Sequence, residues 1–277
     1  LIKKNKVLII YGPRQVGKTT LVKKFLSSTK LKYKFDSGDN IKIQNILNSE
    51  DFSQIIEYVG ENQLLVIDEA QNIEKIGIGL KIIVDQIRNI YVIATGSSSF
   101  DLANKTGEPL TGRKRTITLY PISQLELSKM YGKFELKEKL DEFLIFGSYP
   151  EIITAKNKAE KIEALEEIIN SYLLKDILTL EKVKGSKIIL DLLKLLAFQV
   201  GSEVSLNELA NNLNIDVKTV QRYLDLLEKS FIIKTLTGFS RNLRSEINRK
   251  NKYYFLDNGI RNGVISQYNE LENRNDI

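Results

Sequence analysis

The stretch Gly12-Pro13-Arg14-Gln15-Val16-Gly17-Lys18-Thr19-Thr20 decides the fold of this chain. It matches the pattern G-x-x-x-x-G-K-[ST] at every fixed position. An apolar run, residues 7–11, precedes it and an amphipathic run, residues 20–26, follows it. A buried strand before this pattern and a helix after it are the context in which it forms a phosphate-binding loop. We therefore predict a strand–loop–helix unit that binds the phosphates of a nucleotide through residues 12–20.

The residue types in this loop suit an anion and a metal ion. Gly12 and Gly17 let the backbone curl close to a ligand without a clashing Cβ. Successive N–H groups then point into the concavity, and the positive end of a helix starting near Lys18 reinforces them. Lys18 is expected to reach the β- and γ-phosphates, and the Thr19 hydroxyl to ligate Mg²⁺. The alternative is a glycine-rich turn with a chance Lys-Thr pair, which both flanking segments disfavour.

Composition excludes several classes of protein. The chain has 277 residues, enough for two ordinary domains, and contains neither cysteine nor histidine. Disulfides, thiolate metal sites and histidine-based catalytic triads are therefore excluded. No signal peptide is visible, and the longest apolar helix candidate, residues 188–200, is too short to span a bilayer. We expect a cytoplasmic protein without a membrane partner, and the net charge of +6 permits a polyanionic one. Because the chain begins with Leu1, we also expect residues missing before it.

A second motif, made of two acidic residues, follows another apolar run. Four apolar residues, 64–67, lead directly into Asp68 and Glu69. Such a run is typical of a parallel strand buried on both faces, and open α/β sheets bind ligands at the carboxyl ends of their strands. Asp68 is therefore a candidate for holding Mg²⁺, and Glu69 for orienting or polarising the attacking water.

Further apolar runs predict a complete sheet. Strands are expected at residues 31–36, near a sheet edge, at 90–95 and at 116–120, and a mostly helical segment at 41–58. With the two strands already described, five strands alternate with helices. This order predicts an α/β fold with a doubly wound parallel sheet.

Hydroxyl and arginine side chains near the last two strands are further candidates. Ser97, followed by Ser98 and Ser99, could touch the γ-phosphate or the lytic water, and we place it ahead of Thr95; the alternative is a serine-rich turn that caps the next helix. Arg113 and Arg115 flank the fifth strand. Arg113 could stabilise transition-state charge, in the same chain or from a neighbouring copy; the alternatives are a basic surface pair or a contact with a nucleic-acid backbone.

The second half of the chain contains a helix-turn-helix pattern. Ser205 and Glu208 form a capping box, and Asp216 can cap a second helix. That helix is expected to bury Val217, Val220, Leu224 and Leu227 and to expose Lys218, Thr219, Gln221 and Arg222. Two apolar runs, 231–233 and 253–256, follow, and the segment between them carries the basic residues Arg241, Arg244, Arg249, Lys250 and Lys252. This pattern predicts a winged helix with a basic wing, suited to DNA phosphates. The alternative is a protein-docking module.

The motifs together resemble the AAA-superfamily ATPases of bacteria and archaea in which an ATPase domain is fused to a winged helix. The resemblance rests on residues 12–20 and on Ile67-Asp68-Glu69-Ala70-Gln71, Thr95-Gly96-Ser97-Ser98, Thr111-Gly112-Arg113, Leu119-Tyr120-Pro121-Ile122-Ser123, Gly147-Ser148-Tyr149-Pro150-Glu151, Tyr172-Leu173-Leu174-Lys175-Asp176-Ile177 and Tyr253-Tyr254-Phe255-Leu256-Asp257-Asn258-Gly259. It implies ATP as the nucleotide, Mg²⁺ dependence, a central phosphate-loop strand, Glu69 as catalytic glutamate and a sensor residue near Ser97. Members usually continue into a nuclease-like domain, which we do not expect within these residues.

We expect an ATPase core at residues 1–130, a helical lid or connector at 131–185, a winged helix at 186–265 and a tail at 266–277. One hypothesis is an Mg²⁺-dependent ATPase whose nucleotide state moves the winged helix. The other is a nucleotide-gated switch or docking module with negligible hydrolysis. The expected partners are ATP, double-stranded DNA, and a protein partner or a second copy of the chain.

Overall fold

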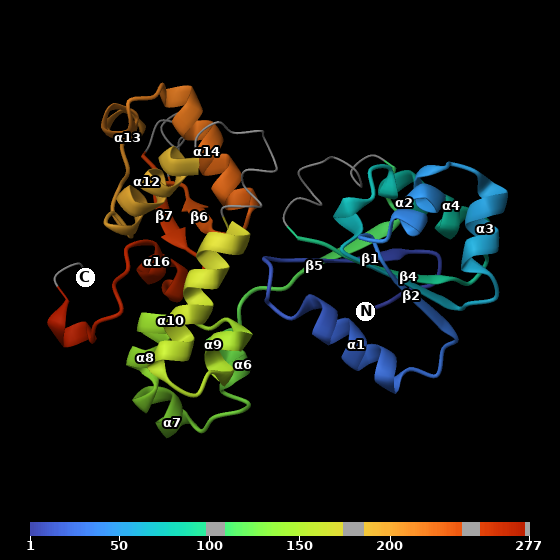
Figure 1. Ribbon diagram of the computed structural model, residues 1–277, viewed down its shortest axis with the longest axis horizontal. Helices are drawn as coiled ribbons and strands as arrows, with labels where there is room; N and C mark the ends of the chain where they lie inside the picture. Colours follow the sequence, from blue (N-terminus) through green and yellow to red (C-terminus); the bar gives the residue numbers. More distant parts are fainter. Residues whose placement is uncertain (98–108, 174–185, 240–249, 275–277) are drawn as a thin grey trace. The chain divides into compact units, whose positions relative to one another are not determined.

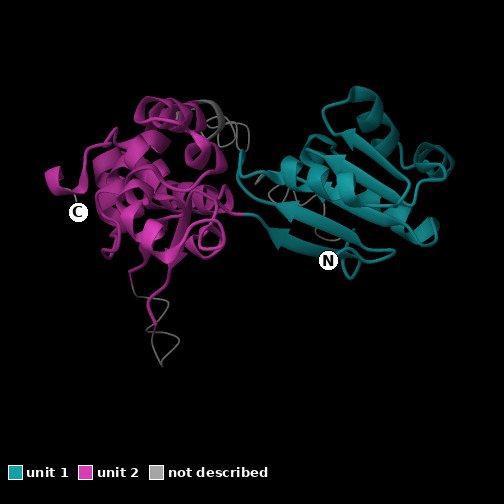
Figure 2. Cartoon of the chain, turned by 90° about the horizontal axis from the view of Figure 1, so that it is seen from below, with its two compact units in different colours: residues 1–119 teal, residues 120–277 magenta. Residues whose placement is uncertain are grey.

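The chain folds into two compact units, residues 1–119 and 120–277 (Figure 2). The computed structural model describes residues 1–97, 109–173, 186–239 and 250–274. The boundary between the units falls between Leu119 and Tyr120, and residues 120–277 form a single unit. The division of this second half into a connector, a winged helix and a tail stays a prediction.

The first unit is built on a five-stranded parallel sheet with the order β2-β3-β4-β1-β5 (Figure 1). Its strands are β1 (Val7–Tyr11), β2 (Tyr33–Ser37), β3 (Leu64–Asp68), β4 (Tyr91–Thr95) and β5 (Lys114–Thr118). The sequence predicted all five, and the α/β class with a parallel sheet is confirmed. The edge position expected for the second strand is correct. β1 is an interior strand, but β4, not β1, is the middle one.

Helices cover both faces of this sheet. Val22 and Leu26 of α1 (Lys18–Ser28) pack against Leu8 and Ile10 on one face. Because successive strand side chains point to opposite faces, Val7 and Ile9 point to the other. Figure 1 shows α2 (Ile41–Asn48) and α4 (Ile76–Gln86) on that face, and α4 packs against both α2 and α3 (Phe52–Val59). Coverage on both sides explains why the inner strands are continuously apolar.

The helical segment expected at residues 41–58 is two helices rather than one. α2 ends at Asn48, and Glu50 has a positive φ of 59°. Asp51 then caps α3, because its Oδ1 accepts hydrogen bonds from the backbone N–H groups of Ser53 (2.8 Å) and Gln54 (3.2 Å). The apolar spacing continues across this polar break, and for that reason the sequence pattern alone indicates one longer helix.

The second unit is mainly helical. Its elements are α6 (Gln124–Leu127), α7 (Lys133–Glu138), α8 (Leu140–Phe146), α9 (Pro150–Thr154), α10 (Lys158–Glu167), a π-helical turn (Ile168–Leu173), α12 (Ser186–Ala197), α13 (Leu206–Leu213), α14 (Val217–Lys229), β6 (Ile233–Leu236), β7 (Lys252–Phe255), α16 (Asn258–Val264) and a short 3₁₀ helix (Leu271–Asn273). Helix α16 packs against α8, α10 and α12. It therefore connects the early helices of this unit to the late ones.

Helices α13 and α14 are followed by an antiparallel pair, β6 and β7. The Ser205 half of the predicted capping box and the predicted Asp216 cap both form: Ser205 accepts a hydrogen bond from the Glu208 N–H, and Asp216 accepts one from the Thr219 N–H. In α14, Val220, Leu224 and Leu227 are buried as expected, together with Tyr223 and Leu226, whereas Val217 is only partly buried. This order of elements is the one a winged helix requires, and that assignment stays a prediction.

A buried carboxylate connects the loop after α8 to the start of α16. Asp257 accepts hydrogen bonds from the backbone N–H groups of Ser148 (2.8 Å) and Ile260 (3.2 Å). A Cβ on Gly147, whose φ is 75°, would lie 2.0 Å from Asp257 Oδ1, so glycine is required there. Burial raises the pKa of Asp257, against the opposing effect of these hydrogen bonds.

We predict that ionisation of Asp257 opposes folding. Because the pKa of Asp257 is raised in the folded state, Asp257 contributes its full stabilisation below its unfolded-state pKa, about 3.9. That stabilisation is lost as the pH rises through the folded-state pKa. The free energy of unfolding of wild type relative to Asp257→Asn should therefore decrease as the pH rises above about 4. Urea unfolding at several pH values measures this difference.

Asp216→Asn is the control, because we expect the stability difference from wild type to change with pH in the opposite direction. Hydrogen bonds from Thr219 lower the pKa of Asp216, so its contribution is present above the unfolded value and is lost on acidification. A difference between wild type and Asp257→Asn that does not change with pH would contradict the prediction.

Candidate nucleotide-binding site

The phosphate-binding motif forms a tight loop at the carboxyl edge of the sheet, between β1 and α1. Gly12 and Gly17 have φ values of 149° and 91°, which favour glycine. A Cβ on Gly12 would lie 2.0 Å from the carbonyl oxygen of Leu119. Both fixed glycines of the motif are thus required by the backbone itself.

Lys18 lies inside the loop. It is 5% exposed, and its Nζ donates hydrogen bonds to the carbonyl oxygens of Gly12 (2.9 Å) and Pro13 (2.7 Å). Helix α1 begins at this residue, and its N-cap, Gly17, has no side chain to cover the first backbone N–H groups. A cationic side chain and a helix N-terminus therefore converge on one loop, an arrangement suited to phosphate.

Asp68, at the end of β3, accepts hydrogen bonds from two hydroxyl groups. Thr19 Oγ1 donates to Asp68 Oδ2 at 2.8 Å, and Thr95 Oγ1, at the end of β4, donates to Asp68 Oδ1. Asp68 is 8% exposed and Thr95 is fully buried. The structure thus brings Thr19 and Asp68, the two residues predicted to hold the metal, into contact. It also shows Thr95 as a second hydrogen-bond donor to Asp68.

The oxygen atoms of Thr19 and Asp68 fit a magnesium site of the phosphate-loop type. Mg²⁺ prefers oxygen ligands and usually keeps several waters, with only one or two protein ligands and the substrate phosphates. Within the described parts of the chain, no group of three or more acidic side chains is placed to hold a metal. The small donor set at Thr19 and Asp68 agrees with an ion held jointly by protein and nucleotide.

Glu69 and Ser97 are connected through Gln71. The Glu69 backbone is in the left-handed region (φ 48°, ψ 40°), and its N–H donates to Thr95 Oγ1 at 3.2 Å. Gln71 Nε2 donates to Glu69 Oε2, and the N–H of Ser97 donates to Gln71 Oε1 at 3.4 Å. The predicted water-orienting residue and the predicted sensor therefore belong to one hydrogen-bonded group. Ser98 and Ser99 lie outside the described residues.

The contacts of Thr95 and Gln71 cannot be seen in the sequence pattern alone. We ranked Ser97 ahead of Thr95 as a contact for the γ-phosphate or the lytic water, and that ranking stays a prediction. The direct bond from the Thr95 hydroxyl to Asp68 was not foreseen. The parallel register, which pairs Ile67 with Ala94, puts the next residues of both strands side by side. Strand order and register were the missing information. For Gln71, the sequence signal that could have indicated a contact with Glu69 was its position two residues further along the chain.

The structure separates Arg113 from this site. Its carbonyl oxygen accepts a hydrogen bond from the N–H of Val7 at the start of β1, so Arg113 lies at the amino edge of the sheet. Arg113 is therefore separated from the carboxyl edge by the whole of β5, which is about 13 Å long over its four residue steps. Its Nε donates to Asp85 Oδ1 at 2.7 Å, and Asp85 raises the pKa of Arg113. A catalytic role for Arg113 toward the loop of its own chain was therefore a wrong prediction.

The residues expected to contact DNA lie in the second unit. Lys218, Gln221 and Arg222 are exposed on α14. Thr219 is partly buried, and its Oγ1 donates to Asp216 Oδ2 at 2.7 Å, so it serves the helix cap. Arg241 and Arg244 lie outside the described residues.

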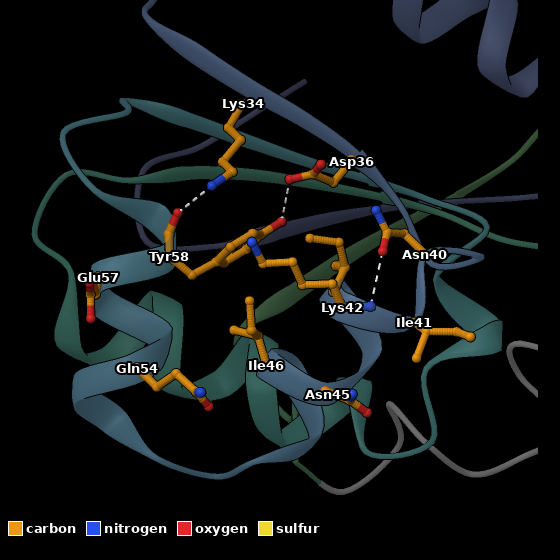
Figure 3. A pocket seen from close by; sticks show the side chains of 11 residues that line it. Lys34, Asp36, Asn40, Ile41, Lys42, Asn45, Ile46, Gln54, Glu57 and Tyr58 are labelled. Atoms are coloured by element: carbon orange, nitrogen blue, oxygen red, sulfur yellow. Dashed lines mark hydrogen bonds between the residues drawn. The ribbon is translucent and has the colours of Figure 1, made fainter.

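The first unit has another hollow, between β2, α2 and α3, with a volume of about 880 Å³ (Figure 3). Lys34 Nζ donates to the Tyr58 carbonyl oxygen at 2.6 Å and lies 3.9 Å from the centre of the Tyr58 ring. The Tyr58 hydroxyl donates to Asp36 Oδ2, and burial and this contact raise the pKa of Tyr58. No residue of the 12–20 loop lines this hollow, so it is separate from the candidate site.

Comparisons with known proteins agree with this geometry. Residues 4–128 match a family described as "AAA domain", and residues 137–271 match one described as "Domain of unknown function (DUF8612)". A solved Walker-type ATPase of Pyrococcus abyssi has a similar fold, with a TM-score of 0.61 and 14% identity over 95% of this chain and 91% of that one.

Similar curated proteins are longer than this chain. An uncharacterized protein of Haemophilus influenzae is 27% identical, covering 96% of this chain and 72% of its own length. Uncharacterized proteins of Methanocaldococcus jannaschii and Mycobacterium tuberculosis are 25% and 26% identical, and the chain covers 61% and 55% of their lengths. None of the helices in the described ranges is both long and apolar enough to cross a membrane. The first unit thus has a P-loop NTPase fold similar to the AAA domain family, and the second is similar to a family of unknown function.

Proposed function

We propose that this chain is an Mg²⁺-dependent ATPase whose nucleotide state controls a winged-helix module in its second unit. The observation that carries the proposal is that Lys18 lies inside one glycine-dependent loop, whose Thr19 is hydrogen-bonded to Asp68, the residue directly before Glu69. The similarity of residues 4–128 to the AAA domain family supports ATP as the nucleotide.

Each residue has a role that follows from its position. The loop N–H groups and Lys18 bind the β- and γ-phosphates, so Lys18 Nζ exchanges the carbonyl oxygens of Gly12 and Pro13 for phosphate oxygens. Thr19 and Asp68 hold Mg²⁺, which when bound neutralises charge on the phosphates. Glu69 orients the attacking water and accepts its proton. Thr95 holds the Asp68 carboxylate in place.

We predict that Glu69→Gln separates binding from turnover. The substitution keeps the size of the side chain and removes its basic oxygen, so ATP hydrolysis should fall by at least about 100-fold. The dissociation constant for a fluorescent ATP analogue with Mg²⁺ should stay within about threefold of wild type, because Glu69 does not hold the phosphates.

A matched control is Lys18→Ala, which should abolish binding as well as turnover, because it removes the cation from the loop. Steady-state phosphate release and equilibrium fluorescence measure the two quantities. Wild-type turnover near zero would reject the ATPase and favour the alternative, a nucleotide-gated switch with little hydrolysis. Clear wild-type turnover that Glu69→Gln leaves unchanged would reject the role given to Glu69.

We further propose that α13, α14, β6 and β7 form a winged helix that contacts double-stranded DNA. The supporting observation is the exposure of Lys218, Gln221 and Arg222 on α14. Lys218 and Arg222 suit phosphate contacts, which supply most of non-specific affinity. The alternative is docking of a protein partner or a second copy of the chain. A second copy could also bring Arg113 to a neighbouring loop.

We predict that the double variant Lys218→Ala/Arg222→Ala weakens binding to a DNA duplex by about 10-fold or more. The slope of log affinity against log salt should fall by about two, because two phosphate contacts are lost. Fluorescence anisotropy across a salt series gives both quantities. Lys229→Ala, at the exposed C-terminal end of the same helix, is the control and should change binding little. Absence of salt-dependent DNA binding in wild type would favour the docking alternative.

A further inference from the structure

Gln71 bridges the ends of two neighbouring strands. It lies in the short 3₁₀ turn Ala70–Asn72 that follows Glu69, and it is 6% exposed. Its amide nitrogen donates to Glu69 Oε2, and its amide oxygen accepts the N–H of Ser97, two residues after β4. One side-chain amide therefore contacts the proposed water-orienting carboxylate and the backbone of the predicted sensor.

The backbone of Glu69 is already held in place around this bridge. The N–H of Asn72 donates to the Glu69 carbonyl oxygen at 3.1 Å, and the N–H of Gly38 donates to the Asp68 carbonyl oxygen at 2.7 Å. A Cβ on Gly38 would lie 2.4 Å from that Glu69 oxygen, so the loop after β2 packs tightly against it. With the main chain held, the remaining freedom of Glu69 lies in its side-chain torsions. The bond from Gln71 restrains those torsions.

An amide is well suited to orienting a carboxylate that must stay basic. It donates a hydrogen bond at any pH and carries no charge, so it fixes one oxygen without neutralising the base. The other oxygen is then available to a water molecule. A base oriented by a third group is a recurrent arrangement where a nucleophile must be activated.

We propose that Gln71 is a positioning residue for the ATPase reaction: it holds Glu69 Oε2 so that Oε1 faces the attacking water, and it couples Glu69 to the backbone at Ser97. This inference rests on the proposed function. It assigns Gln71 no contact with the nucleotide itself.

The kinetic test compares Gln71→Met with a matched control. Methionine keeps the volume of glutamine and removes both polar atoms, so kcat should fall by about 10-fold or more, with KM for ATP within about twofold. The control is Gln44→Met, which also removes a side-chain amide. The amide of Gln44 donates to the Gly38 carbonyl oxygen, in the loop after β2, at 2.7 Å. The kcat of this variant should remain within about twofold of wild type.

A readout in nucleotide-free protein tests the coupling without turnover. Glu69→Gln should shift the amide resonance of Ser97 in ¹H–¹⁵N spectra, because the change passes through Gln71. The same substitution should leave that resonance unmoved in a Gln71→Met background.

The outcomes separate the two proposals. If wild type hydrolyses ATP and Glu69→Gln abolishes this, the proposed function stands. Unchanged kcat in Gln71→Met would then overturn the positioning role. A Ser97 shift that persists in the Gln71→Met background would overturn the coupling, whether or not the chain hydrolyses ATP.

Discussion

The carboxylate of Asp68 accepts hydrogen bonds from hydroxyl groups on two other elements, and the candidate site is arranged around it. Thr19 on α1 and Thr95 at the end of β4 each donate to one of its oxygens. A buried charge needs such partners, because desolvation without them is costly. The two bonds hold the start of α1 and the ends of β3 and β4 together. Residues from distant parts of the chain therefore meet at one edge of the sheet.

The loop before α1 adds a second constraint, which acts through the backbone. Gly12 passes so close to the Leu119 carbonyl oxygen that no Cβ fits, and Lys18 folds back onto the loop carbonyl groups. In the proposed function the phosphates replace those carbonyl oxygens as partners of Lys18. Binding then exchanges internal hydrogen bonds for contacts with the nucleotide, and leaves the cation paired before and after.

Much of this site could be predicted from sequence because its chemistry lies in contiguous motifs. The spacing of Gly12, Gly17, Lys18 and Thr19 is set by local loop geometry, and Asp68 follows a recognisable buried strand. Thr95 and Gln71 could not be ranked in this way, because their contacts depend on the pairing of β3 with β4. Arg113 was misplaced for another reason: it precedes its strand, and in a parallel sheet the residue before a strand lies at the amino edge, opposite the loop of residues 12–20. The break between α2 and α3 depends on an Asp51 cap that apolar spacing does not reveal.

A crystal structure of the chain with Mg²⁺ and a non-hydrolysable ATP analogue tests the central claim most directly. The account predicts the triphosphate in the loop of residues 12–20, with Lys18 Nζ moved from the Gly12 and Pro13 carbonyl oxygens to the phosphates. It also predicts Mg²⁺ beside Thr19 and Asp68. A nucleotide bound elsewhere, or a Lys18 that keeps both carbonyl contacts with the analogue present, would contradict it.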